Sequence, residues 1–162
     1  MILVTGGERS GKSSFALKKA ISMGRKKAFI ATAEPIDAEM INRIRNHKME
    51  RKDLFDTFEE PLRLDVVLKE TASYDVRIIE CMTTWMGNVL HYGLDIQETS
   101  KKFFDSLIGN EIIVTNEVGM GIVPFDPLTR KYVEELGKLN MKLSDRCDEV
   151  YFMVSGIPVK IK

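Results

Sequence analysis

The chain has 162 residues, of which 44% are hydrophobic and 30% are charged, and its 24 Lys and Arg residues balance its 24 Asp and Glu residues. This length and composition predict a single globular domain, residues 1–162, with a buried core. A net charge of zero provides no positive field to hold a nucleic acid, so a small nucleotide is favoured over a polynucleotide as the ligand.

Signals for export or membrane insertion are missing from the sequence. No apolar run approaches the roughly 20 residues of a membrane span. The N-terminus has neither the basic region nor the cleavage site of a secretory signal.

The two cysteines of the chain, Cys81 and Cys147, do not have the spacing of metal ligands. Two such thiols suit a reducing compartment, so we expect a cytoplasmic protein.

Short apolar runs alternate with helical patterns along the whole chain. Strands are predicted at residues 1–5, 27–32, 76–80, 111–116 and 149–155, and helices at 12–23, 37–51, 61–72, 83–92, 97–108 and 127–146. Residues 54–58 are a candidate for a further short strand, and residues 159–162 for a C-terminal edge strand. The alternation predicts an α/β fold with right-handed βαβ units and a mainly parallel sheet. Ligands of such folds bind at the carboxyl ends of the strands.

The first predicted strand leads into a glycine-rich segment that matches G-x-x-x-x-G-K-[ST]. It consists of Gly6, Gly7, Glu8, Arg9, Ser10, Gly11, Lys12 and Ser13. Glycines let backbone N–H groups approach phosphate oxygens closely, and the start of the following helix favours an anion. Lys12 would neutralise the outer phosphates, and the Ser13 hydroxyl would ligate Mg²⁺. Because a strand precedes the motif and a helix follows it, we expect a bound nucleoside triphosphate that is used for phosphoryl or nucleotidyl transfer.

A P-loop also needs an acid at the end of a neighbouring strand, to orient the metal or its waters. Two predicted strands end at such acids, the strand at 76–80 at Glu80 and the strand at 111–116 just before Glu117. A solvent-exposed acid at a strand end is the alternative for each. The pattern alone leaves both as candidates.

His47 lies on the predicted helix 37–51 and continues its apolar face. This periodicity alone favours a packed structural histidine. Its basic surroundings favour a functional one, because nearby cations can hold phosphates and a neutral imidazole can attack phosphorus. These cations are Arg43, Lys48 and Arg51, within a basic stretch that also contains Arg45 and Lys52. The other histidine, His91, lies near a predicted helix end before Gly93 and is interpreted as a surface residue.

Segments spread over nearly the whole chain resemble one known family, in the expected order. They are residues 6–13, 31–33, 43–48, 80–85, 115–124 and 154–160. The stretch at 115–124, Thr-Asn-Glu-Val-Gly-Met-Gly-Ile-Val-Pro, is far more specific than the P-loop. Together they resemble the bifunctional adenosylcobinamide kinase / adenosylcobinamide-phosphate guanylyltransferase of cobalamin biosynthesis.

The resemblance implies a three-layer, RecA-like P-loop NTPase domain and two reactions. ATP or GTP phosphorylates the aminopropanol hydroxyl of adenosylcobinamide. GTP then transfers GMP to an enzyme histidine, with loss of pyrophosphate, and the adenosylcobinamide phosphate takes the GMP to give adenosylcobinamide-GDP. The resemblance also implies a homo-oligomer, a trimer or a dimer.

Matching motif to motif, His47 takes the position of the guanylylated histidine, and this outweighs the structural interpretation from periodicity. The implied nucleotide contacts are residues 6–13 together with Ala31, Thr32, Ala33, Lys48, Met49, Glu50, Arg51, Glu59 and Glu80. Glu59 rests on the fewest anchors, because Glu60 is adjacent to it. Ser13 and Glu80 are the expected Mg²⁺ ligands, with Glu117 as the competing candidate.

Two other functions fit the P-loop by itself. The first is a different kinase for a small alcohol, in which His47 is only structural. A covalent GMP adduct would distinguish the bifunctional enzyme from such a kinase, because an ordinary kinase does not form one. The second is a RecA-type regulatory or motor module, which nucleic acid would stimulate and which the neutral charge disfavours.

Overall fold

The structure, a computed structural model, describes residues 1–35, 41, 42, 45 and 54–162. Seven strands form one sheet: β1 (Ile2–Gly6), β2 (Lys27–Ala31), β3 (Asp56–Glu59), β4 (Val76–Glu80), β5 (Glu111–Val114), β6 (Glu149–Val154) and β7 (Ile157–Lys160). The helices around it are α1 (Lys12–Ile21), α3 (Leu64–Glu70), α4 (Met82–His91), α5 (Ile96–Asp105) and α6 (Pro127–Arg146). The predicted α/β fold is confirmed.

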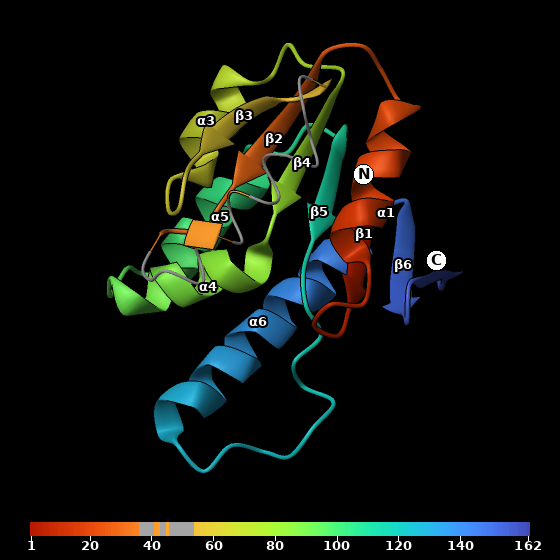
Figure 1. The fold of residues 1–162 in the computed structure, drawn as a ribbon. Coiled ribbons are helices and arrows are strands. Elements are labelled where there is room, and N and C mark those ends of the chain that lie inside the picture. The colour runs from red at the N-terminus through yellow and green to blue at the C-terminus, as the bar shows by residue number, and fades with distance from the viewer. Residues whose placement is uncertain (36–40, 43–44, 46–53) are drawn as a thin grey trace.

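The order of the strands places β1 inside the sheet. The order is β3-β2-β4-β5-β1-β6-β7, and every neighbouring pair is parallel except β6 and β7. β1 pairs with β5 on one side and with β6 on the other, so β4 and β5 separate it from β2. The carboxyl ends of the parallel strands therefore meet at one edge of the sheet, where the P-loop follows β1 (Figure 1).

Two apolar layers cover the sheet because alternate residues of each strand face opposite sides. Ile79 packs on one side with residues of α3, α4, α5 and α6, and Trp85 and Phe103 lie at the centre of this layer. Ile78 packs on the other side, where Ala16 and Ala20 of α1 lie against the strands. The central strands are short, apolar and buried on both faces, as the three-layer arrangement requires (Figure 1).

Both α5 and α6 begin with a side-chain cap. Asp95 accepts a hydrogen bond from the backbone N–H of Glu98 at the start of α5. Asp126 does the same with Thr129 at the start of α6, whose first residue is Pro127. An acceptor at the cap and a proline at the first position are favourable, since the first helical N–H groups have no partner within the helix.

Several helices and strands begin or end at other residues than the sequence predicts. The predicted helix 61–72 is shortened to α3, because the Glu60 carboxylate accepts the backbone N–H groups of Leu62 and Arg63 in a turn before it. The candidate strand 54–58 forms at Asp56–Glu59, and the edge strand forms at Ile157–Lys160 rather than at 159–162. The predicted helix 37–51 falls largely outside the described residues, although 41, 42 and 45 are helical.

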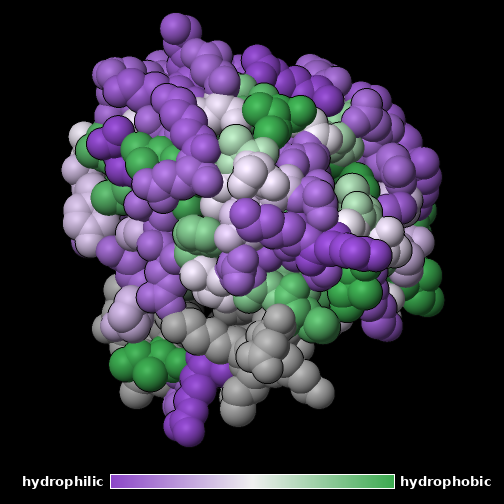
Figure 2. All heavy atoms as spheres, turned by 90° about the horizontal axis from the view of Figure 1, so that it is seen from above, coloured by the Kyte–Doolittle hydropathy of each residue, from purple (hydrophilic) through white to green (hydrophobic). Residues whose placement is uncertain are grey.

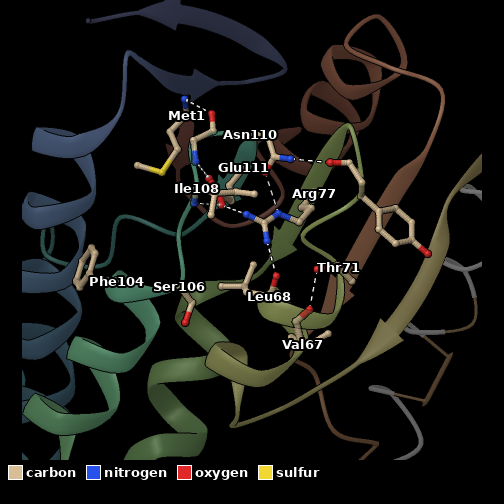
Figure 3. A network of polar contacts seen from close by, with 12 residues as sticks. Met1, Val67, Leu68, Thr71, Arg77, Phe104, Ser106, Ile108, Asn110 and Glu111 are labelled. Atoms are coloured by element: carbon tan, nitrogen blue, oxygen red, sulfur yellow. Dashed lines mark hydrogen bonds and ion pairs between the residues drawn. The ribbon is translucent and has the colours of Figure 1, made fainter.

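A buried ion pair joins β4 and β5 near their amino ends, away from the P-loop (Figure 3). The fully buried guanidinium of Arg77 contacts the Glu111 carboxylate and also donates to the carbonyl of Leu68 and to Asn110 Oδ1. Glu111 accepts the backbone N–H groups of Ile108 and Gly109, both at 2.9 Å. Burial lowers the pKa of Arg77, and the adjacent Glu111 opposes this shift. Each polar group is matched, which is the condition for burying charge in a core.

The surface at this end of the molecule is mostly hydrophilic. Figure 2 looks onto the end where the parallel strands begin and shows only small, separated hydrophobic patches. The N-terminal amino group lies here against Asp148, 2.6 Å from its carboxylate. Among the residues that the structure describes, no helix combines the length and apolar character needed to cross a membrane.

Candidate active site

The P-loop connects β1 to α1, and its backbone requires glycine at two positions. Gly6 has a φ of 144° and Gly11 a φ of 93°, in the region that side chains with a Cβ disfavour. A Cβ on Gly6 would also lie 2.6 Å from the carbonyl oxygen of Met153 on β6. Gly11 approaches the turn between β6 and β7, where Gly156 donates its N–H to the carbonyl of Ser10 at 3.0 Å. The C-terminal hairpin therefore supports the phosphate loop from one side.

Lys12 bends back over this loop. Its ammonium nitrogen lies 2.5 Å from the carbonyl oxygen of Gly7 and 3.5 Å from Ser10 Oγ, and the residue is only 7% exposed. A buried ammonium that stays within the loop places a positive charge beside the backbone N–H groups at the start of α1. Such an arrangement suits the terminal phosphates of a nucleotide.

The Ser13 hydroxyl is hydrogen-bonded to the Glu80 carboxylate at the end of β4. These hard oxygen donors suit Mg²⁺, which takes one or two protein ligands and fills its other positions with phosphate oxygens and water. Within the described ranges, no group of three or more His, Cys, Asp or Glu side chains forms a metal cage. Ser13 and Glu80 are thus the described pair that could hold Mg²⁺ together with a nucleotide.

Glu117, the competing acid, is directed elsewhere. Its backbone N–H donates to the carbonyl of Gly6 at 3.1 Å, so the residue lies beside the P-loop. Its carboxylate, however, accepts the backbone N–H of Gly119 at 3.0 Å. The structure therefore brings Glu80, and not Glu117, into contact with Ser13.

The segment after β2 is held against the end of β4. The Thr32 hydroxyl accepts the backbone N–H of Cys81 and donates to its carbonyl, both at 2.8 Å. The backbone N–H of Thr32 also donates to the carbonyl of Glu80 at 2.9 Å, and the Asn88 amide donates to the carbonyl of Thr32 at 2.9 Å. Thr32 and its partly buried neighbours Ala31 and Ala33 therefore form one wall beside Glu80.

Glu59 lies at the same edge of the sheet. Ala31 is paired with Glu59 of β3 on one side and with Glu80 of β4 on the other, so the three residues end neighbouring strands. Glu60 instead uses its carboxylate for the turn before α3. Glu59 therefore ends a strand at this edge, whereas Glu60 belongs to the turn before α3, and the choice of Glu59 as a nucleotide contact stays a prediction.

Sequence reasoning missed a set of polar residues that hold the chain where it leaves β5. The Asn116 amide donates to Glu8 of the P-loop at 3.0 Å, and its backbone N–H donates to the Thr83 hydroxyl at 2.7 Å. Asn140 of α6 donates to the carbonyl of Asn116 at 3.1 Å and accepts from the Thr115 hydroxyl at 2.9 Å. Tyr132 donates to the carbonyl of Thr83 at 3.1 Å, and burial raises its pKa to about 12. Asn116 lies in the specific 115–124 motif, but nothing in the motif indicates its partners.

The predicted residues His47, Lys48, Met49, Glu50 and Arg51 lie outside the described residues. The other predicted site residues, 6–13, 31–33, 59 and 80, are all described, and they gather at the carboxyl ends of β1, β2, β3 and β4.

Residues 2–161 match the family model described as cobinamide kinase / cobinamide phosphate guanyltransferase. The chain belongs to this family. It is an enzyme with the two activities that the family's description states, and the resemblance found in the sequence is confirmed. The two competing functions, an unrelated small-molecule kinase and a RecA-type motor module, are thereby set aside.

Curated relatives with bifunctional activity names align with this chain over nearly their whole lengths. The chain is 38% identical to the bifunctional adenosylcobalamin biosynthesis protein CobP of Pseudomonas aeruginosa, across 99% of this chain and 96% of the relative. It is 37% identical to the corresponding CobU protein of Escherichia coli and 38% identical to that of Salmonella typhimurium. Both alignments cover 100% of this chain and 99% of the relative.

Proposed function

We propose that residues 1–162 form a single P-loop domain that carries out two successive transfers on one nucleotide-binding edge. The domain first phosphorylates the aminopropanol hydroxyl of adenosylcobinamide with ATP or GTP. It then transfers GMP from GTP, through a guanylylated His47, to the adenosylcobinamide phosphate. The observation that carries this proposal is the contact between Ser13 and Glu80 beside Lys12, at the point where the P-loop opens α1.

In the kinase step, the P-loop backbone and Lys12 hold the β- and γ-phosphates of the donor. The substrate oxygen attacks the γ-phosphorus, the bond from that phosphorus to the β-phosphate oxygen breaks, and the hydroxyl proton passes to solvent or a nearby base. Mg²⁺, when bound by Ser13 and Glu80, would offset charge on the departing diphosphate. Catalysis here depends on positioning and on charge stabilisation by this chain's own groups.

In the guanylyl transfer, a neutral nitrogen of His47 attacks the α-phosphorus of GTP and pyrophosphate leaves. The ring keeps the proton on its other nitrogen as the N–P bond forms, so that it can leave as a neutral imidazole in the next step. A phosphate oxygen of adenosylcobinamide phosphate then attacks the same phosphorus, and the N–P bond breaks to restore the histidine. We assign the nucleotide contacts to residues 6–13, 31–33 and 48–51 and to Glu59 and Glu80.

The setting of the enzyme follows from the same proposal. Its partners are the small molecules adenosylcobinamide and adenosylcobinamide phosphate, with no nucleic acid. We expect it in the cytoplasm as a homo-oligomer, either a trimer or a dimer.

The experiment that tests the proposal follows the two ends of the triphosphate. GTP labelled at the α-phosphorus should mark the wild-type protein through an acid-labile, base-stable bond, and GTP labelled at the γ-phosphorus should leave no such mark. His47→Ala should abolish the α-label while largely keeping phosphorylation of adenosylcobinamide, because that step needs the P-loop and the substrate hydroxyl. Labelling should fall at acid pH in the wild type as the imidazole protonates.

His91→Ala is the matched control, since His91 ends α4 and is exposed. It should label normally. Labelling that persists in His47→Ala, or a wild type that never labels, would show that transfer does not pass through this histidine.

A further inference from the structure

An exposed apolar surface lies beyond the carboxyl end of β5, on the segment that leads into α6. Its large side chains are 64% to 97% exposed and fall within nine consecutive positions: Met120, Ile122, Val123, Phe125 and Leu128. Figure 1 shows this segment extending past the P-loop before the chain turns back into α6. Apolar side chains gathered in this way mark a binding surface rather than ordinary scatter.

The surface is hollowed and is held in shape. A groove runs between the segment and the first half of α6, with Ile122, Val123 and Val133 among its walls. Arg130 of α6 fastens the segment by donating to the carbonyls of Pro124 and Phe125. At the far side of the groove, Glu134 is paired with Lys138 at 2.7 Å. The groove therefore presents apolar walls with its charges already matched, which suits a large apolar ligand with a polar rim.

The groove starts where the phosphate site ends. Asn116 and Glu117 directly precede the residues that line the groove. The Asn116 amide donates a hydrogen bond to Glu8 at 3.0 Å, and the backbone N–H of Glu117 donates one to the carbonyl of Gly6 at 3.1 Å. Gly119, which lines the groove, is bonded to the Glu117 carboxylate. The segment that forms one wall of the groove therefore begins directly beside the P-loop.

The chemistry of the substrate fits this position. A cobinamide consists of a corrin ring whose periphery carries methyl groups and amide side chains, and its reacting hydroxyl is carried on a short arm. The hydroxyl must come within about 3–3.5 Å of the γ-phosphorus for in-line transfer. The ring must then rest within one arm's length of the phosphate site, and the groove is an apolar hollow on the segment that leaves this site.

We propose that this groove, between residues 118–124 and the first half of α6, is the docking site of the corrin ring. The inference rests on the proposed function, because it takes adenosylcobinamide as the phosphoryl acceptor. The hollow shape and the direct connection to the P-loop favour the corrinoid over a second copy of this chain as the occupant.

The test measures adenosylcobinamide binding directly, by equilibrium dialysis read from corrinoid absorbance. Ile122→Ser and Val123→Ser should each weaken binding about 10-fold or more, since both side chains line the groove and would be buried by the ring. Both side chains are exposed in the free protein, so the fold should persist. The Kd for GTP and the α-label on the protein should stay at wild-type values.

Met141→Ser is the matched control, because Met141 is 69% exposed on the same helix but lies outside the groove. It should bind adenosylcobinamide as the wild type does. Unchanged corrinoid affinity in both groove variants would overturn the proposal. If the variants instead sediment as smaller species at unchanged corrinoid affinity, the surface is a contact between copies and the proposal is likewise overturned.

The outcome is separable from that of the proposed function. The dialysis reports ring docking even in a protein that forms no GMP adduct, and the α-label reports guanylylation even where the ring docks elsewhere.

Discussion

At the scale of single residues, the candidate site depends on a few side chains whose polar groups are buried or directed by neighbours. Lys12 is nearly buried within the P-loop, and its charge has the Gly7 carbonyl and the Ser10 hydroxyl as partners. Ser13 lies at the start of α1, Glu80 ends β4, and the two meet through one hydrogen bond. The geometry of these three residues places a cation and two oxygen ligands at the start of one helix.

Lys12→Ala should weaken nucleoside triphosphate binding by about 10- to 100-fold, because a charge-assisted contact to phosphate contributes about 1.5–3 kcal/mol. Both transfer rates should fall further, since the charge that Lys12 offsets grows during transfer. Isothermal titration with GTP and separate assays of the two steps measure these effects. Lys18→Ala, an exposed lysine on the same helix, should behave as the wild type. Wild-type binding and rates in Lys12→Ala would remove the P-loop from the mechanism.

Glu80→Gln should raise the Mg²⁺ concentration needed for half-maximal turnover, since an amide is a poorer ligand for a hard cation than a carboxylate. Glu117→Gln should leave the Mg²⁺ dependence unchanged, because the Glu117 carboxylate is directed to Gly119. Titrating the kinase step with Mg²⁺ in both variants separates the two acids. The opposite ranking would transfer the metal role to Glu117.

At the scale of elements, polar contacts hold β4 and β5 in place at both ends of the sheet. At their amino ends, Arg77 and Glu111 form a fully buried ion pair. At the carboxyl end, α4 and α6 hold the chain after β5 through Thr83 and Asn140. The first contact supports the stability of the sheet, while the second sets the direction in which the segment beside the P-loop leaves it.

Glu111→Gln should lower the free energy of unfolding by about 3–5 kcal/mol, because it leaves the Arg77 charge buried without its counter-ion. Urea unfolding followed by circular dichroism measures the loss. Removing both charges, in Arg77→Met with Glu111→Gln, should cost less than the sum of the two single changes. Lys101→Ala breaks an exposed pair with Asp105 and should change stability very little. Additive losses in the double variant would mean that the two charges act independently.

At the scale of the whole molecule, the helices on one face and the C-terminal hairpin close around a single edge of the sheet. Tyr132 ties α6 to α4, and Cys147 is buried where α6 ends. Burial raises the pKa of Tyr132 to about 12 and that of Cys147 to about 11. Folding therefore keeps both groups protonated at pH values where the unfolded chain releases their protons.

This difference predicts how the protein unfolds in alkali. The contribution of Tyr132 is complete below pH 10, its ordinary pKa, and is lost as the pH rises from 10 towards 12. Each pKa unit corresponds to about 1.4 kcal/mol at most. Tyr132→Phe should be slightly less stable at pH 7, since it loses the bond to Thr83, but its stability should decline less steeply above pH 10. Urea titrations at several pH values compare the slopes, and equal slopes would contradict the assignment.

Much of the fold and part of the site could be predicted from local pattern alone. The glycines at 6 and 11, Lys12 and Ser13 form a contiguous motif, and the strand, loop and helix that carry it follow one another directly in the sequence. The apolar runs at β4 and β5 likewise require burial on both faces, whatever their neighbours are. The position of the site also follows, because parallel strands end at one edge.

The tertiary structure alone decided which acid contacts Ser13 at that edge and what surrounds it. Glu80 and Glu117 both lie at strand ends, and their local sequences do not differ in a way that selects one. Glu80 meets Ser13 because α1 packs against β4, whereas the Glu117 carboxylate is directed to Gly119. The contacts of Asn116 with Glu8 and Thr83 join positions far apart in the chain, and no local periodicity encodes such pairings. The groove beside α6 arises in the same way, since a hollow exists only after distant segments have packed against each other.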